Sequence, residues 1–141
     1  DDEDSHRTLD ETGFDQAQIL IKHLEPFAID ELYTSDYTRC VQTVTPLANA
    51  RGLSITTVPS LNEESFETDP EKAIIFANAL KQDEKNILIC SHNPVIPSML
   101  RGILNTKLKT KELIKLEPGD AWIVHRVRGE IVGLDYLSIA N

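Results

Sequence analysis

The apolar run Ile87–Cys90 constrains the fold most, because the polar turn Ser91-His92-Asn93-Pro94 follows it at once. A short apolar run bounded by turn residues is typical of a buried strand in a parallel sheet. The turn then lies at the carboxyl end of that strand, which is the edge where open α/β sheets bind ligands. The sequence therefore predicts a parallel sheet with a histidine at its ligand-binding edge.

The chain on either side of this strand alternates between helical and extended character. Apolar spacing predicts a helix over about Asp10–Leu24, preceded by the capping-box pattern of Thr8 and Glu11. This alternation predicts a three-layer α/β sandwich with a mostly parallel sheet and helices on both faces. The further strands are expected at Glu31–Ser35 and Ser54–Val58, and the further helices over Tyr37–Ala50, where Pro46 should kink or split the helix, from Asp69 onward, and over about Pro94–Leu104.

The last part of the chain departs from this alternation. Glu117–Asp120 has the composition of a turn, and two extended segments, Ala121–Val127 and Ile131–Leu137, flank Arg128-Gly129-Glu130. Two extended segments joined by a short glycine-containing connection are typical of a hairpin. We therefore expect a C-terminal antiparallel hairpin at the edge of the fold.

Composition limits the classes of protein to which the chain can belong. Its 141 residues, 40% of them hydrophobic, fit one domain over 1–141. No apolar stretch approaches the roughly 20 residues that span a bilayer, and the acidic start Asp1–Asp4 is unlike a signal peptide. We therefore expect a cytoplasmic protein that does not bind membranes. The net charge of −9 disfavours a nucleic acid polymer as a partner, so any anion site must be local.

Several kinds of catalytic centre are excluded by spacing. A cysteine phosphatase needs an arginine shortly after its cysteine, at the positions that Pro46 and Ile96 occupy after Cys40 and Cys90. Ser91 lacks the flanking glycines of a hydrolase nucleophile, and no glycine-rich phosphate loop with its lysine is present. The histidines lack the spacing of a zinc site, so no metal is expected. Both cysteines are expected to be reduced, buried thiols.

Two strand-to-helix turns hold the polar residues that can carry chemistry. The first runs from Ser35 to Arg39, and the second is Ser91-His92-Asn93. In one parallel sheet Arg39 and His92 emerge at the same edge, where a guanidinium can bind two phosphoryl oxygens and an imidazole a third. As alternatives, Arg39 is a surface charge and His92 an ordinary turn residue. We interpret His23 and His125 as structural or solvent-exposed residues. The role of His6 stays open.

Four blocks of the sequence form one recognisable pattern: Arg7–Gly13 with Gln16-Ala17, Leu32–Ser35 through Arg39–Thr43, Leu88–Pro94, and the weaker Leu61-Asn62-Glu63. Together they resemble the histidine phosphatase superfamily, also called phosphoglycerate mutase-like. The pattern is closest to the phosphatase domain that follows a Nudix domain in some bacterial MutT-like proteins, with phosphohistidine phosphatases of the SixA kind second.

The resemblance implies roles for individual residues. Arg39 matches the phosphate-clamping arginine, and His92 matches the second histidine, which hydrogen-bonds the transferring phosphoryl group. Glu63 falls where many members place the acid that protonates the leaving oxygen, and the adjacent Glu64 is the alternative. The resemblance implies a chemistry without metal or organic cofactor. The expected substrate-binding residues are Arg7, Ser35 and Asn93, with a salt bridge near the helix start as the alternative role of Arg7.

One defining element of the family is absent from these residues, namely an N-terminal strand ending in Arg-His-Gly whose histidine becomes phosphorylated. His6-Arg7 has the two residues in the wrong order. We therefore expect a domain that lacks its first strand. Unpaired buried backbone groups would cost it about 1 to 3 kcal/mol each. The missing segment is expected as a separate peptide or as an upstream part of the native protein, with a Nudix domain before it.

Three functions follow as expectations from this resemblance. The first is hydrolysis of a phosphoric monoester or nucleoside diphosphate, with a small phosphorylated substrate, a nucleotide by preference, reacting through a phosphohistidine. The second is removal of phosphate from a histidine of a signalling protein, and the third is phosphate binding without catalysis. A long ordered loop over residues 59 to 70 would roof a metabolite pocket and favour the first over the second.

Overall fold

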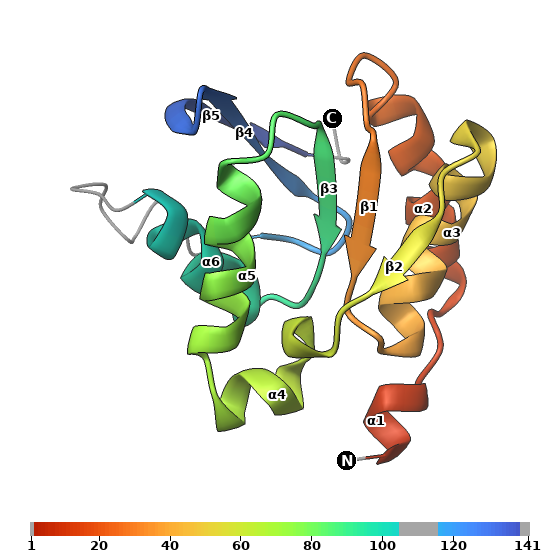
Figure 1. Ribbon diagram of the computed structural model, residues 1–141. Helices are drawn as coiled ribbons and strands as arrows, with labels where there is room; N and C mark the ends of the chain where they lie inside the picture. The colour runs from red at the N-terminus through yellow and green to blue at the C-terminus, as the bar shows by residue number, and fades with distance from the viewer. Residues whose placement is uncertain (1, 105–115, 139–141) are drawn as a thin grey trace.

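The computed structural model of the protein describes residues 2–104 and 116–138 (Figure 1). Twelve helices and strands follow one another in these residues. Nine of them correspond to predicted elements, whereas the three short helices at Asp2–His6, Pro59–Leu61 and Glu63–Thr68 were not predicted. In chain order they are α1 (Asp2–His6), α2 (Glu11–His23), β1 (Glu31–Thr34), α3 (Thr38–Arg51), β2 (Ile55–Thr57), the 3-10 helix η1 (Pro59–Leu61), α4 (Glu63–Thr68), α5 (Glu71–Lys81), β3 (Ile87–Cys90), α6 (Val95–Leu104), β4 (Ala121–Val127) and β5 (Glu130–Leu137).

The central sheet is parallel and has the strand order β2-β1-β3. Leu32 in β1 is in register with Ile55 on one side and Leu88 on the other. The β4 and β5 strands pair antiparallel as a separate two-stranded sheet. The predicted α/β fold with a C-terminal antiparallel hairpin is confirmed.

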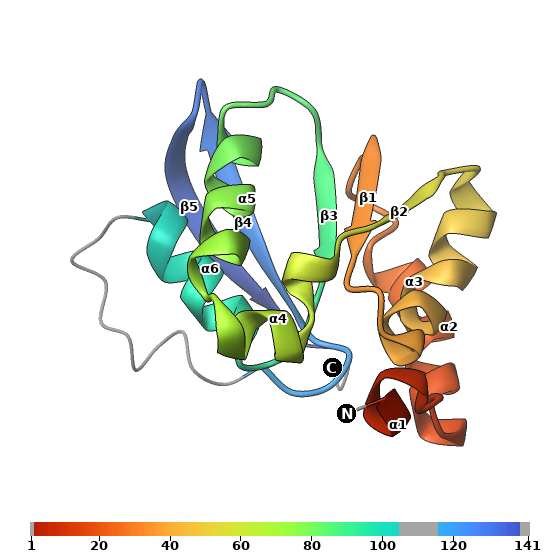
Figure 2. The ribbon, with the colours of Figure 1, turned by 60° about the horizontal axis from the view of Figure 1, so that its bottom comes forward.

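Alternate residues of the strands pack against helices on opposite faces of the sheet. The sheet is therefore the middle of three layers, with a layer of helices on each side. On one face Leu32 and Leu88 pack with Val44 and Ala48 of α3. On the other face Ile89 packs against a cluster from α5 and α6 that includes Ala77 and Met99, and Figure 2 shows these two helices on the side away from α2 and α3. This alternation follows from the period of two along a strand.

Two helices differ from their predicted form, namely α2 at its N-terminal cap and α3 at its proline. The capping box of Thr8 and Glu11 does not form; Asp10 caps α2 instead, and its carboxylate accepts a 2.7 Å hydrogen bond from the backbone N–H of Gly13. The predicted break at Pro46 is also absent from the secondary structure, since α3 continues through it and ends at Gly52 in the left-handed conformation. Burial of Val44 and Leu47 on either side of the proline holds that helix against the sheet.

The β3 strand is less buried than its apolar sequence predicts. All four of its residues are only partly buried, and β1 is its one hydrogen-bonded neighbour within the described residues. The β4–β5 hairpin lies on the side of β3 away from β1 in both Figure 1 and Figure 2, and its Ile123 packs in the same cluster as Leu88. The partial exposure therefore has a physical reason, because one edge of β3 carries side-chain packing without strand pairing.

The acidic start of the chain takes part in the fold from Asp2 onward. It forms the short helix α1, which contacts α3. Within the described residues, no helix is both long and apolar enough to cross a membrane.

Candidate active site

The predicted polar turns meet at the carboxyl edge of the parallel sheet. Ser35 follows β1 and His92 follows β3, and the backbone N–H of Ser35 donates a 2.9 Å hydrogen bond to the Cys90 carbonyl, which ties the two strand ends together. Arg39 lies in the first turn of α3, and Glu63 is the first residue of α4. The site thus collects side chains from segments far apart in the sequence.

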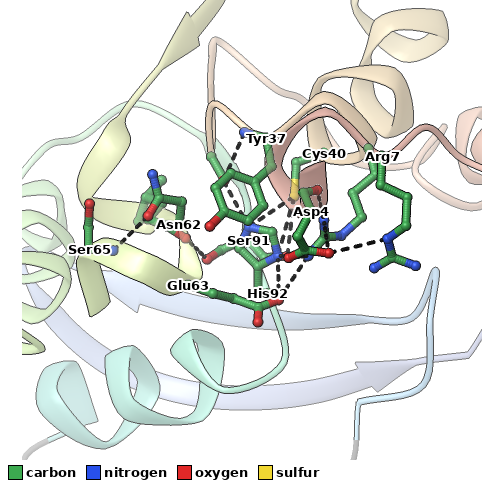
Figure 3. Close-up of polar contacts among 12 residues, drawn as sticks. Asp4, Arg7, Tyr37, Cys40, Asn62, Glu63, Ser65, Ser91 and His92 are labelled. Carbon is green, nitrogen blue, oxygen red and sulfur yellow. Dashed lines mark hydrogen bonds and ion pairs between the residues drawn. The ribbon is translucent and has the colours of Figure 1, made fainter. Parts of the chain in front are cut away.

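Arg39, Glu63 and His92 contact one another and form a compact cluster, of which Figure 3 labels Glu63 and His92. One carboxylate oxygen of Glu63, Oε1, lies 2.9 Å from Arg39 Nη2 and 3.2 Å from His92 Nδ1. Arg39 Nη2 lies 3.4 Å from the same imidazole nitrogen. The side chain of His92 is only 4% exposed, whereas that of Glu63 is 35% exposed. The cluster therefore runs from a buried imidazole to a partly exposed carboxylate.

Local hydrogen bonds fix the position of Glu63. The side chain of Asn62 caps α4 by accepting a 2.7 Å bond from the Ser65 N–H, and its amide donates to Asp36 Oδ1 at 2.8 Å. Ser91 Oγ donates to the Leu61 carbonyl at 2.6 Å, which joins this segment to the turn after β3. Glu63 is thereby held beside His92, while the adjacent Glu64 is exposed. Of the two acids that the sequence offered, Glu63 is the one that the structure brings to the imidazole.

Arg39 also binds a second acidic residue, which the sequence did not indicate. Its Nη1 donates to the Asp4 carbonyl at 2.9 Å, and the two carboxylate oxygens of Asp4 lie 3.4 Å from Nη1 and Nη2. Arg7 Nε donates to Asp4 Oδ1 at 3.3 Å, while its side chain is 63% exposed. Arg7 therefore reaches the cluster through Asp4, and the guanidinium fork of Arg39 holds a carboxylate.

The other two residues expected to bind substrate, Ser35 and Asn93, occupy different places relative to the cluster. The hydroxyl of Ser35 is buried and lies 2.8 Å from His92 Nε2, on the far side of the ring from Glu63. Since Ser35 is fully buried, it supports the imidazole from behind. Asn93 is exposed in the turn after His92 and is not among the side chains that contact the cluster in the described residues.

Tyr37 and Cys40 complete the surroundings of His92, and both were missed as site residues. The ring of Tyr37 packs edge-on against the imidazole with centroids 4.9 Å apart, and Arg39 Cζ lies 5.0 Å from the centre of the same ring. Cys40 Sγ lies 3.7 Å from His92 Nε2. Their positions beside Arg39 at the start of α3 could have indicated that they belong to the site. Residues at the start of that helix lie at the same end of the sheet as Arg39.

Both of these neighbours are held in their neutral forms. Burial raises the pKa of the Tyr37 phenol. The hydrogen bond with the Cys90 thiol, followed by burial, raises the pKa of the Cys40 thiol well above its ordinary value. Because a neutral thiol is a poor nucleophile, Cys40 serves as packing around the imidazole. Both cysteines are free thiols, as expected, although Cys90 is only partly buried.

The cluster suits a tetrahedral oxyanion. A guanidinium offers paired N–H donors that match two phosphoryl oxygens, and an imidazole beside it offers a further donor or a proton. Within residues 2–104 and 116–138, no group of three or more His, Cys, Asp or Glu side chains is arranged to hold a metal ion.

Comparison with known sequences identifies the family. Residues 2–72 match the profile of the histidine phosphatase superfamily (branch 1). A curated relative, the 8-oxo-(d)GTP phosphatase of Mycolicibacterium smegmatis, is 32% identical over 136 residues, which cover 96% of this chain and 42% of that protein. The chain therefore spans less than half the length of this relative.

Solved structures share the fold at low sequence identity. The protein histidine phosphatase SixA in complex with tungstate superposes with a TM-score of 0.79 at 18% identity, over 97% of this chain and 87% of that one. A mutant phosphoserine phosphatase from Entamoeba histolytica in complex with phosphoserine gives a TM-score of 0.69 at 17% identity, over 94% and 85% of the two chains.

Proposed function

The chain belongs to the histidine phosphatase superfamily, and from this premise we propose that it hydrolyses a small phosphorylated substrate through a phosphohistidine intermediate. The observation that carries the proposal is the convergence of Arg39, Glu63 and His92, in which Glu63 Oε1 lies 2.9 Å from the guanidinium and 3.2 Å from the imidazole. A partly buried cation next to an imidazole is an arrangement that stabilises charge on a transferring phosphoryl group.

In the proposed reaction Arg39 and His92 bind the equatorial oxygens of the phosphoryl group. A nucleophilic histidine attacks phosphorus, a P–N bond forms, and the P–O bond to the leaving group breaks. Water then attacks the phosphohistidine, which breaks the P–N bond and releases phosphate. Phosphoryl transfer depends chiefly on positioning and charge stabilisation, and a clamped, partly buried guanidinium supplies both.

Glu63 is proposed to protonate the leaving oxygen. The ion pair with Arg39 keeps its carboxylate engaged in the unliganded site. A phosphoryl group that takes over the Arg39 donors would free Glu63 to carry a proton to the leaving group. The greater exposure of Glu63 relative to His92 supports this division, because the leaving group must lie on the open side of the phosphoryl group.

The nucleophile is proposed to lie in a segment outside these 141 residues. His92 is the one histidine of the described cluster, and Glu63 and Ser35 contact its two ring nitrogens. The edge of β3 that pairs with no strand among the described residues offers a place where an additional strand can pair and deliver a histidine to the same sheet edge. The greater length of the curated relative is consistent with such a segment and with an upstream Nudix domain.

A nucleotide is the proposed substrate. The 32% identity to a protein named as an 8-oxo-(d)GTP phosphatase supports a nucleoside phosphate. Residues 59 to 70 contain η1 and α4, so an ordered segment borders the cluster, as expected for an enclosed metabolite site. A phosphohistidine on a protein surface would need a more open site, which makes it the second choice.

Phosphate release by the full-length protein tests this function. The panel comprises nucleoside diphosphates and triphosphates, sugar phosphates and phosphohistidine peptides, with Arg39→Ala, His92→Ala and the remote control His125→Ala measured beside the wild type. We expect the nucleotides to be hydrolysed fastest and only the first two variants to lose activity. Comparable turnover in all four proteins would overturn the site assignment, and preference for the phosphopeptide would overturn the substrate class.

Mass spectrometry of the purified native protein tests the origin of the nucleophile. A copurified peptide or an upstream extension that ends a strand in histidine would support the enzyme. A different residue at that position would favour a phosphate-binding module, and a stable monomer of these 141 residues alone would contradict the need for an additional strand.

A further inference from the structure

Tyr37 is a buried aromatic residue that packs on polar groups of the candidate active site. It is only 4% exposed, yet none of the four apolar clusters formed within residues 2–104 and 116–138 includes it. The centre of its ring lies 4.9 Å from that of the His92 imidazole and 5.0 Å from Arg39 Cζ. Figure 3 shows the ring against His92. The ring is therefore buried against the site and not within the apolar core.

The side chain of Tyr37 does not serve the helix that it begins. Tyr37 is the N-cap residue of α3, and its side chain makes no capping hydrogen bond. Ser, Thr, Asp and Asn are favoured at such a position because their side-chain oxygen accepts a bond from the first backbone N–H groups of the helix. The Tyr37 backbone is nevertheless fixed, since its N–H donates to Ser35 Oγ at 3.3 Å and its carbonyl accepts from the N–H groups of Cys40 and Val41. A fixed backbone thus presents a ring that the helix itself does not need.

The contacts of Arg39 divide into those that occupy its N–H donors and one that does not. The Glu63 carboxylate lies 2.9 Å from Nη2, and the two oxygens of the Asp4 carboxylate lie 3.4 Å from Nη1 and Nη2. The Tyr37 ring instead faces Cζ. An aromatic ring attracts a guanidinium through the negative charge on its face and accepts no N–H bond in doing so. An oxyanion that takes over the donors must displace the carboxylates, whereas the ring contact stays in place.

We propose that Tyr37 is a positioning residue whose ring holds the Arg39 guanidinium in place while an oxyanion replaces the carboxylates at its N–H donors. The same ring packs edge-on against His92, so one side chain keeps both groups of the proposed oxyanion site side by side. Groups that are held in place before binding lose less conformational freedom when the anion binds. The part that concerns a phosphoryl group rests on the proposed phosphatase function, whereas oxyanion binding is measured without turnover.

Calorimetric titration of the full-length protein with tungstate, a tetrahedral oxyanion, tests the role of the ring. The variants are Tyr37→Phe and its forms with one, two or three fluorine atoms on the ring, which keep nearly the same shape but withdraw negative charge from the ring face. The dissociation constant of Tyr37→Phe should stay within about twofold of the wild-type value, because the two rings carry similar charge on their faces. It should then rise with each fluorine, by about fivefold at three, the range of a partly desolvated cation–π contact.

Two further variants serve as controls. Tyr37→Leu removes the ring and should weaken tungstate binding at least as much as the trifluorinated ring does. Tyr33→Leu is the matched control, because it removes an aromatic ring that packs on Phe76, with centroids 5.3 Å apart. Its dissociation constant for tungstate should equal the wild-type value. Thermal unfolding of each variant, followed by circular dichroism, separates a loss of stability from a loss of binding.

Three outcomes would overturn this role of Tyr37. The first is an equal dissociation constant across the fluorinated series, which keeps the shape of the ring and changes its charge distribution. The second is a loss in Tyr37→Phe as large as that in Tyr37→Leu, since the hydroxyl would then be responsible. The third is a wild-type protein that binds no tungstate, whether or not it hydrolyses a phosphate ester.

The role of Tyr37 and the phosphatase function fail in distinguishable ways, because tungstate binding does not depend on turnover. A full-length protein that releases no phosphate, but whose tungstate affinity falls with each fluorine, would overturn the phosphatase function and support the role of Tyr37. An active phosphatase whose tungstate affinity does not change with fluorination would do the reverse.

Discussion

Two histidines of the described residues each pair with a carboxylate, yet only one of them belongs to the candidate active site. His125 in the hairpin lies 2.7 Å from Asp135, which is shorter than the 3.2 Å between His92 and Glu63. The side chains of the hairpin pair, however, are 46% and 73% exposed, whereas His92 is 4% exposed. The comparison teaches that a short contact does not identify chemistry.

What distinguishes His92 is the number of groups that converge on it. A hydroxyl holds one nitrogen, a carboxylate and a guanidinium face the other, and an aromatic ring packs on its edge. The His125–Asp135 pair in the hairpin is exposed to solvent, so this ion pair contributes little to the free energy of folding. We therefore expect substitutions in the two regions to differ in activity by orders of magnitude.

The largest expected contrast is between Arg39 and the hairpin. Arg39→Ala should lower kcat of the full-length protein about 1000-fold, since an arginine on a transferring phosphoryl group contributes on that order. Arg39→Lys should remain severely impaired, because an ammonium lacks the paired donors of the guanidinium. His125→Ala should keep wild-type kcat. Phosphate release measures all three, and a Lys variant of wild-type activity would contradict a clamping role.

The second prediction concerns Glu63, because the effect of replacing a proton donor depends on the leaving group of the substrate. Glu63→Gln should lower kcat about 100-fold on a substrate with a poor, alkoxide-type leaving group, and only slightly on a nitrophenyl phosphate, whose leaving group needs no proton. The exposed neighbour provides the matched control, because Glu64→Gln should leave both rates unchanged. Equal losses on the two substrates in Glu63→Gln would contradict proton donation.

Asp4 is expected to compete with anions for Arg39. Asp4→Asn removes the charge that the fork binds at 3.4 Å, so inorganic phosphate should inhibit this variant at lower concentration, by about fivefold or less, the range of a partly exposed ion pair. Inhibition constants compare it with the wild type. Weaker phosphate inhibition in the variant would show that Asp4 supports anion binding instead.

The smallest effect is expected for the exposed pair itself. Asp135→Asn should change the free energy of unfolding by less than about 1 kcal/mol and leave kcat unchanged. Thermal unfolding followed by circular dichroism measures the first quantity. A decrease of several kcal/mol in the free energy of unfolding would contradict this prediction and would show that the His125–Asp135 pair stabilises the fold despite its exposure.

The fold and the meeting of the central residues could be predicted from the sequence. Two strands followed by polar turns, in a parallel sheet, bring Arg39 and His92 to one edge whatever lies between them. The choice of Glu63 over Glu64 was beyond the sequence, because it depends on the Asn62 cap that orients α4. Likewise, the burial of Ser35 depends on which way one side chain points just after a strand ends.

The unpredicted features share a cause, namely contacts between segments far apart in the chain. Asp4 reaches Arg39 across 35 positions, and no local pattern in an acidic lead-in indicates that partner. The partial exposure of β3 arises because no strand pairs with its second edge among the described residues. The N-terminal cap of α2 differs from the prediction for a local reason, because two neighbouring residues can cap this helix and Asp10 does so instead of Thr8.

A crystal structure of the full-length protein with tungstate, a tetrahedral oxyanion, tests the central claim most directly. The account predicts the ion bound to the Arg39 guanidinium and to His92 Nδ1, with the Asp4 carboxylate displaced. An ion bound elsewhere, with Asp4 still seated on Arg39, would contradict it.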